Sequence, residues 1–328
     1  MRRLRYLWLA LLVGAIWLGG YFLEQNLNQY VLRVVINCGI ACILALSLNL
    51  INGCAGQFSL GHAGFMGIGA YTSAALTTVS GLAFFQTPMG IGTSVVVGGV
   101  MAGIAGYLVG LPSLRLKGDY LAIVTLGFGE IIRIVFLNID AIGGARGLPG
   151  IPRESNFFWV FLWASLTFIC LFSLIRSSFG RAILAVREDE IAAEAMGIHV
   201  SHYKIVAFVI SSLFAGIAGA LFAHYQGFID PNTFNFNRSV EAVIMVVIGG
   251  MGSFSGALIG AVIVTVLPEL LRVFETYRMV IFPALLILTM MVRPMGLLGR
   301  KEIWDWLKPK KKAQPGRRAK VGKVEYVT

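Results

Sequence analysis

The sequence contains little charge: Asp, Glu, Lys and Arg together make up 13% of its 328 residues, whereas 57% are hydrophobic. A typical soluble domain carries roughly 25% charged residues. The mean hydropathy of +0.79 and the long apolar runs also exclude an ordinary soluble fold. The composition therefore indicates an integral membrane protein.

Cysteine is also scarce, with four residues that all lie in or beside apolar segments. Cys38 and Cys42 share a helix face, but no His or carboxylate joins them, so we expect no metal site. The motif G-x-x-x-x-G-K-[ST] is missing from the sequence, which excludes nucleotide binding by the P-loop route. We therefore expect no catalytic residues and no cofactor bound by this chain. Energy for any pumping must come from a partner or from an ion gradient.

Apolar segments of about 20 residues, the length that crosses a bilayer as a helix, recur along the chain. Backbone groups in lipid must be hydrogen-bonded within the protein, and the segments lack the alternation of barrel strands. The predicted fold class is all-α, a polytopic membrane protein with about ten transmembrane helices, some short or broken, and one cytoplasmic helix. The expected spans are 6–23, 31–50, 62–80, 90–110, 120–138, 157–175, 204–224, 239–250, 255–270 and 278–293.

The basic residues predict the orientation of these spans. With the N-terminus in the cytoplasm, the cytoplasmic segments hold three Lys or Arg before the first span, two at 115–117, four in 176–204 and eleven from 293 onward. That places 20 of the 27 basic residues inside, as the positive-inside rule requires. Joining 239–250 to 255–270 as one span would put the basic C-terminal end outside. We therefore keep them separate and expect both termini in the cytoplasm.

The domain organisation follows from the same counts. Residues 1–299 form the expected transmembrane domain, with a first span interpreted as uncleaved because no clear A-x-A signal-peptidase site follows it. Residues 300–328 form a basic cytoplasmic tail with ten Lys or Arg against three acids. We expect such a tail to contact anionic membrane lipid. We expect no nucleic-acid partner, because the tail has little aromatic interleaving.

Two glycine-rich stretches, 52–71 and 247–260, are predicted to interrupt helices. The first, "NGCAGQFSLGHAGFMGIGAY", has six glycines between 53 and 69, and the second is "VIGGMGSFSGALIG". Each glycine weakens a helix by about 1 kcal/mol relative to alanine. Interrupted backbone at membrane depth either lines a polar passage or lies in tight turns between packed helices, and both interpretations stay open. The candidate pathway residues are Gly56, Gln57, Ser59, His62, Gly249, Gly250 and Gly252.

Single polar residues inside spans have alternative interpretations. His62 is either a substrate ligand or a hydrogen-bonded structural histidine. Glu130 and Arg133, three residues apart in span 120–138, are a candidate intramembrane ion pair. Charges in the membrane face the protein interior, so this pair either neutralises itself or takes part in translocation.

The loop 176–203 contains the most polar helix of the chain. Four of the sixteen acids fall within seven residues of "GRAILAVREDEIAAEAMGIHV", positions 180–200. A single helix over 183–197 would align Leu184, Ile191, Ala195 and Ile198 in one narrow apolar band and would end at Gly197. Such a thin band suits docking into a groove of another protein, the alternative being a solvated loop helix.

Four ordered stretches resemble one known family. "SFGRAILAVREDEIAAEAMGIHVSHYKIVAFVISSLFAGIAGAL" resembles the cytoplasmic loop and following span of the permease subunits of branched-chain amino-acid ABC transporters. "LSLNLINGCAGQFSLGHAGFMGIGAY", "LPSLRLKGDYLAIVTLGFGEIIR" and "VIGGMGSFSGALIGA" resemble further stretches of that family in the same order. The resemblance covers roughly residues 30–298 and leaves out the basic tail.

The resemblance implies a multi-pass protein of the bacterial inner membrane. Its implied partners are a second homologous permease subunit, usually in a heterodimer, two ABC ATPase subunits that use ATP and magnesium, and a periplasmic or lipid-anchored substrate-binding protein. The implied substrates are leucine, isoleucine and valine, although similar permeases serve urea, short amides and other small carboxylates. An ion-coupled secondary transporter with Glu130 or Glu241 as its proton site is the rival hypothesis.

The loop would then be the coupling helix, similar to the EAA loop of ABC importers. That pattern has Glu directly before Ala-Ala, whereas here Ile191 separates Glu190 from Ala192, and Gly197 keeps its expected place. The coupling role follows from the resemblance, but the contribution of each acid stays open. The candidate coupling residues are Arg187, Glu188, Asp189, Glu190, Ile191, Glu194, Ala195 and Gly197.

Overall fold

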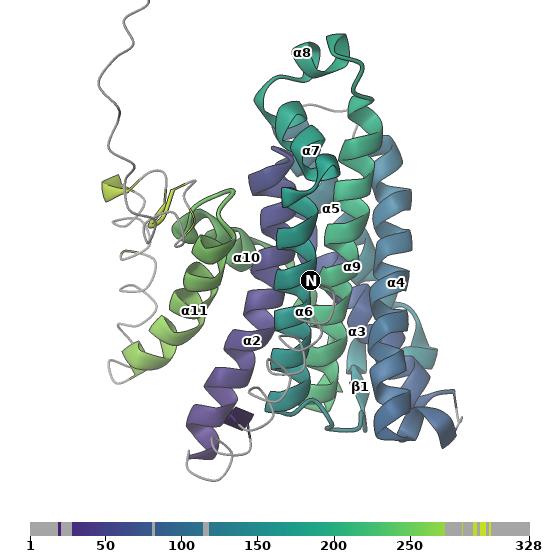
Figure 1. The fold of residues 1–328 in the computed structure, drawn as a ribbon. Helices are drawn as coiled ribbons and strands as arrows, with labels where there is room; N and C mark the ends of the chain where they lie inside the picture. The colour runs from purple at the N-terminus through teal and green to yellow at the C-terminus, as the bar shows by residue number, and fades with distance from the viewer. Residues whose placement is uncertain are drawn as a thin grey trace, which may run out of the picture.

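The computed structural model describes residues 19–20, 28–80, 83–113, 118–272, 284, 291–293, 296–299 and 302. Figure 1 shows a bundle in which α2, α4, α6 and α9 run side by side, α7 and α8 cap one end, and α10 and α11 pack beside α2. The expected spans 6–23 and 278–293 and the tail 300–328 lie almost entirely outside the described residues.

The helices alternate with short connections. The long helices are α2 (Gln29–Asn49), α3 (His62–Thr78), α4 (Pro88–Ser113), α5 (Asp119–Leu137), α6 (Phe157–Arg176) and α9 (Val200–Gln226). The shorter helices are η1 (Leu50–Cys54), η2 (Ala83–Gln86), η3 (Asp140–Ile142), η4 (Gly144–Arg146), α7 (Ser178–Glu188), α8 (Glu190–Ala195), η5 (Pro231–Phe234), α10 (Phe236–Gly249) and α11 (Phe254–Leu270). Two short strands, β1 (Leu148–Pro149) and β2 (Phe228–Ile229), pair antiparallel.

These helices confirm the all-α class, and a helix lies at each of the eight spans expected between 31 and 270. Five helices in the described part of the chain are long and apolar enough to cross a membrane: 29–54, 89–113, 119–137, 157–176 and 200–226. The ends follow local chemistry. Asn28, Asn156 and Ser253 accept hydrogen bonds from the first turns of α2, α6 and α11. Gly227 ends α9 with a φ of +72°.

The span expected at 239–250 is short and starts inside the bundle. α10 has 14 residues, about 21 Å, which is less than the roughly 30 Å hydrocarbon core. Phe234, just before α10, packs edge-on against Tyr71 of α3 with ring centroids 6.1 Å apart. At its other end, the turn after Gly249 bonds to the end of α2. α10 is therefore too short to cross the hydrocarbon core by itself.

Glycine contacts hold the centre of the bundle together. α3, α4 and α9 approach so closely that a Cβ on Gly69 would overlap the backbone of Gly216, and one on Gly219 would overlap the Met66 carbonyl. Gly98 fits against Gly69 in the same way. Small residues replace the hydrophobic driving force that lipid cannot supply between helices. These contacts fix the half of α9 that is distant from the loop against α3 and α4.

We expect Gly219→Ala to destabilise the protein, because its methyl group would collide with the α3 backbone. Overpacking of this kind costs about 1–3 kcal/mol. The matched control is Gly127→Ala in α5, where an added Cβ meets no atom within 4 Å. Thermal unfolding in detergent should show a lower Tm for Gly219→Ala and an unchanged or higher Tm for Gly127→Ala. Equal melting temperatures would contradict the packing described.

Candidate functional site

The loop between α6 and α9 forms two helices rather than the single predicted helix over 183–197. α7 ends at Glu188, Asp189 is extended with a φ of −157°, and α8 begins at Glu190. The Asp189 carboxylate accepts hydrogen bonds from the N–H groups of Ile191 (2.9 Å) and Ala192 (3.1 Å). The prediction of one helix was wrong because an aspartate that caps a new helix interrupts the one before it.

This break also removes the predicted continuous apolar band. Ile191 is 78% exposed and Ala195 is exposed, whereas Leu184 is half-buried. On α7, Ile183 and Val186 are buried against the bundle. The loop therefore has an attached part, α7, and a projecting part, α8.

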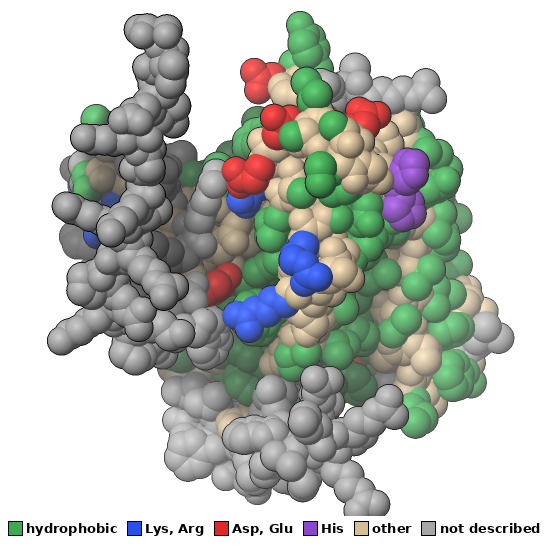
Figure 2. Space-filling view, turned by 45° about the horizontal axis from the view of Figure 1, so that its top comes forward, with side chains coloured by type: hydrophobic (Ala, Val, Ile, Leu, Met, Phe, Trp, Pro, Cys, Tyr) green, Lys and Arg blue, Asp and Glu red, His purple; other side chains and the backbone are tan. Residues whose placement is uncertain are grey.

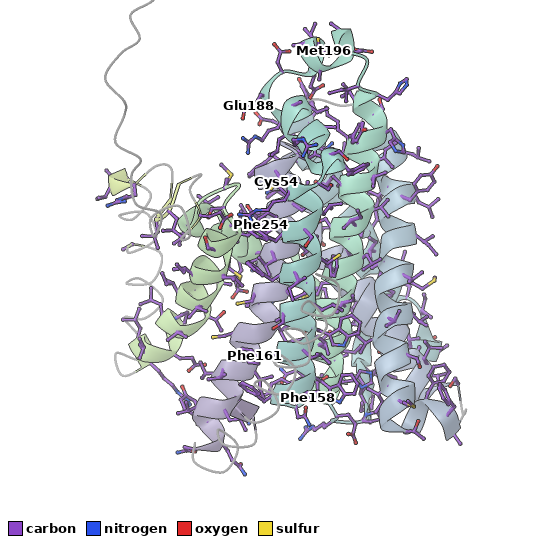
Figure 3. All side chains as sticks on the ribbon, viewed as in Figure 1. Cys54, Phe158, Phe161, Glu188, Met196 and Phe254 are labelled. Atoms are coloured by element: carbon purple, nitrogen blue, oxygen red, sulfur yellow. The ribbon has the colours of Figure 1, made fainter. Side chains whose placement is uncertain are left out.

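The projecting part combines apolar and acidic side chains. Met196 is 82% exposed and stands at the tip of the loop (Figure 3), and Ile191 of α8 is also exposed. Figure 2 shows acidic side chains gathered around the same tip, and Glu188, Asp189 and Glu194 are all exposed. Gly197 follows α8 with a φ of +81° and turns the chain toward α9. The tip thus presents a small apolar surface with an acidic border.

Two charged contacts join this loop to the bundle. Glu190 of α8 forms an ion pair with Lys204, a buried residue of α9. Arg187 of α7 pairs with Glu188 at 2.5 Å and sends its other terminal nitrogen, Nη1, to the carbonyl of Gly53 at 2.8 Å. The Arg187 side chain is only 18% exposed. Its guanidinium therefore lies in the wall of the bundle rather than in the loop.

Arg187 reaches both glycine-rich stretches that the sequence singles out. Its stem packs on Gly56, where a Cβ would lie 2.7 Å from Arg187 Cγ. A Cβ on Gly252 would lie 3.1 Å from Arg187 Nη1. Gly56 and Gly252 have φ of +68° and +93°, so their backbone conformations also favour glycine. The close approach of Arg187 requires both.

Asn49 fastens the two stretches to each other. Its Oδ1 accepts a hydrogen bond from Gly252 N at 2.8 Å, and its Nδ2 donates to the Ser253 carbonyl at 3.2 Å. The backbones of Gly53 and Gly252 touch, because a Cβ on Gly53 would overlap Gly252 N. α2 ends here in the π-helical turn η1, a form that often marks functional positions. We call the region of Asn49, Gly53, Gly56, Arg187 and Gly252 the junction.

Beside the junction, the segment from η1 to α3 buries polar groups that lack protein partners. His62 bonds through Nε2 to the Ser47 hydroxyl at 2.8 Å, and Asn52 accepts from Ser59 N at 3.1 Å. No described residue bonds the remaining polar atoms, which are Asn52 Nδ2, both side-chain polar atoms of Gln57, Ser59 Oγ and His62 Nδ1.

A cluster of this kind is expensive unless water or a polar solute completes its hydrogen bonds. Gln57, Ser59 and His62 are thus buried, and each has a side-chain polar atom without a partner among the described residues. Gly249 and Gly250 lie instead at the α10–α11 turn, where Gly249 packs against Gly256. Ser47 and Asn49 were not predicted as site residues, although each is a polar residue in the otherwise apolar helix α2.

The predicted ion pair of Glu130 and Arg133 is present on α5. Arg133 Nε lies 2.7 Å from Glu130 Oε2, and Arg133 Nη1 donates to Asn232 Oδ1 at 3.0 Å. The two charged side chains are 29% and 23% exposed. On the same helix Ile123 and Ile131 are 64% and 54% exposed. This face of α5 thus combines charged and apolar groups.

The sequence matches the model of one known protein family. A family model described as "Branched-chain amino acid transport system / permease component" matches residues 30–290. The chain belongs to this family.

Members of the family resemble the chain over most of its length. It is 41% identical to the high-affinity branched-chain amino acid transport system permease protein LivM of Escherichia coli, over 79% of this chain and 68% of the relative. A probable LivM of Methanocaldococcus jannaschii is 28% identical over 81% and 92% of the two chains. The permease protein LivH of Escherichia coli is 27% identical over 86% and 97%. No solved structure matches the chain.

In this permease, we expect Arg187→Ala to loosen the junction. Loss of a hydrogen bond from a charged donor costs about 1.5–3 kcal/mol, so local opening should become at least about tenfold more frequent. Cys54 is 1% exposed in η1 and serves as the reporter, with the other three cysteines replaced by serine. Its rate of maleimide labelling should rise by the same factor.

The control for this experiment is Arg181→Ala, an exposed arginine on α7. That substitution should leave the labelling rate of Cys54 unchanged. Equal rates in the Arg187 variant and the parent protein would show that Arg187 does not hold the junction closed.

Proposed function

We propose that the chain is one of two permease subunits of an ATP-driven importer for leucine, isoleucine and valine in the bacterial inner membrane. The names of the relatives support the substrate class. One observation supports the mechanism above all others: Arg187 links a projecting loop to both interrupted segments of the membrane bundle. A displacement of the loop would therefore be transmitted through Arg187 to the segment that holds the buried polar groups of Gln57 and His62.

The projecting helix α8 is the proposed contact for the ATPase subunits. Its exposed Ile191 and Met196 would enter a groove of the partner, and Glu188 and Glu194 would meet basic groups at the rim. This end of the bundle is then cytoplasmic, and the substrate-binding protein delivers at the opposite end. The nucleotide and its magnesium belong to the ATPase subunits.

The second permease subunit is proposed to cover α5. Glu130 and Arg133 form a partly exposed charge pair in the second half of α5, and charges within spans generally face protein or a water-filled passage. The apolar residues on the same helix, including Ile123 and Ile131, suit contact with another helix. A passage between two such faces would lie next to the partnerless polar atoms of Gln57 and His62.

The first test is reconstitution in vesicles. We expect this chain alone to accumulate no leucine under a pH or sodium gradient, because the energy source resides in partner subunits. With its second permease, two ATPase subunits and a binding protein, it should accumulate leucine only when ATP is supplied. Urea supplied in place of leucine tests the substrate class. Gradient-driven accumulation by the single chain would refute the proposal.

The second test is Ile191→Asp, which places a charge at the centre of the proposed docking surface. Burying an unpaired carboxylate costs several kcal/mol, so ATP-dependent uptake should fall at least about tenfold with an unchanged Tm. The matched control is Met89→Asp, because Met89 is 80% exposed at the start of α4, far from the loop. If the Ile191 variant shows normal uptake and still binds the ATPase subunits, docking through α8 is excluded.

A further inference from the structure

A cavity of about 500 Å³ opens at the end of the bundle away from α7 and α8. The first turns of α2, the segment before α6 and the last turn of α9 surround it. Figure 1 shows these three ends together, opposite the loop. Its volume lies in the range of small-molecule sites. Neither the coupling loop nor the junction contributes to it.

Two arginines, Arg33 and Arg153, line this cavity, and no described residue that lines it is acidic. Neither arginine has an ion pair with any residue that the structure describes. Basic residues are also rare at this end, since 20 of the 27 Lys and Arg belong to the opposite side by the topology derived above. Two of the remaining seven meet at one cavity. Within the described part of the chain, this cavity therefore carries positive charge without a facing acid.

The arginines are held in place before any ligand arrives. The stem of Arg153 lies flat against Gly227, where a Cβ would approach Arg153 Cγ to 2.9 Å. Its loop is fixed by a hydrogen bond from Ile151 N to the Gly227 carbonyl (3.3 Å) and by His224, whose Nδ1 lies 3.0 Å from the Pro152 carbonyl. Arg33 lies beside the Tyr225 hydroxyl. Such preorganisation reduces the entropy lost on binding.

The remaining wall is apolar on the α2 side, where Leu32 and Ile36 line the cavity. Guanidinium groups bind carboxylates through paired hydrogen bonds, and an aliphatic surface accepts an aliphatic chain. We propose that this cavity binds small aliphatic carboxylates, with the carboxylate between Arg33 and Arg153 and the chain on Leu32 and Ile36. Amino acids such as leucine belong to this class. This choice of ligand rests on the proposed function.

Equilibrium binding to the purified permease complex tests the proposal, without ATP or binding protein, in phosphatidylcholine nanodiscs. Radiolabelled L-leucine is the probe. Unlabelled 4-methylpentanoate, which lacks the amino group, should displace it, whereas 3-methylbutylamine, which lacks the carboxylate, should not. Arg33→Gln and Arg153→Gln should each weaken leucine binding at least about tenfold, because each loses a charge-assisted hydrogen bond.

The matched control is Arg146→Gln, an exposed arginine at the same end that does not line the cavity. It should leave leucine affinity unchanged. The proposal is wrong if both Gln variants bind leucine normally, or if the amine displaces leucine and the carboxylate does not. It is also wrong if adding phosphatidylglycerol abolishes the arginine-dependent binding, because the cavity would then hold a lipid phosphate.

Uptake by the reconstituted wild-type transporter separates this inference from the proposed function. ATP-driven leucine uptake without arginine-dependent binding would overturn only the cavity assignment. Arginine-dependent binding by a complex that shows no ATP-driven uptake would overturn only the proposed function.

Discussion

A backbone group that leaves a helix inside a bilayer finds no water, and each unsatisfied group costs several kcal/mol. In the described part of the chain, the glycine-rich interruptions after α2 and between α10 and α11 lie against each other, and side chains of α2 and α7 bond their backbones. Asn49 bonds both sides of the second turn, and Arg187 takes the free carbonyl of Gly53 in the first. The packing of α2 against α10 and α11 brings these two distant stretches into contact.

Hydropathy predicted the helices well because crossing a membrane is a local requirement on about 20 consecutive residues. The spans from 31 to 270 therefore lie close to their expected bounds, including the short one at α10. The glycine-rich stretches were also recognisable, since glycine content weakens a helix wherever it occurs. What the sequence could not show is that the stretches touch, because that depends on how α2 packs against α10 and α11.

The loop illustrates a different limit. A regular helical projection assumes an unbroken helix, and Asp189 breaks it by bonding two backbone N–H groups of the next turn. Arg187 was recognised as part of the loop, but its partner is the backbone carbonyl of Gly53, 134 residues away. Every residue has a backbone carbonyl, so the sequence does not indicate which one accepts the hydrogen bond. Likewise, His62 stood out as a polar residue, whereas its bond to Ser47 required the structure.

The contacts of the loop determine where a displacement of α8 would be absorbed. One route leads through Glu190 and Lys204 into α9, which is packed backbone to backbone against α3. The other leads through Arg187 into the junction, where α2 is followed by η1 and a turn separates α10 from α11. A force shared by a stiff and a soft element deforms the soft one. Movement at the loop should thus concentrate at the junction, beside the segment in which His62 Nδ1 and both side-chain polar atoms of Gln57 have no partner among the described residues.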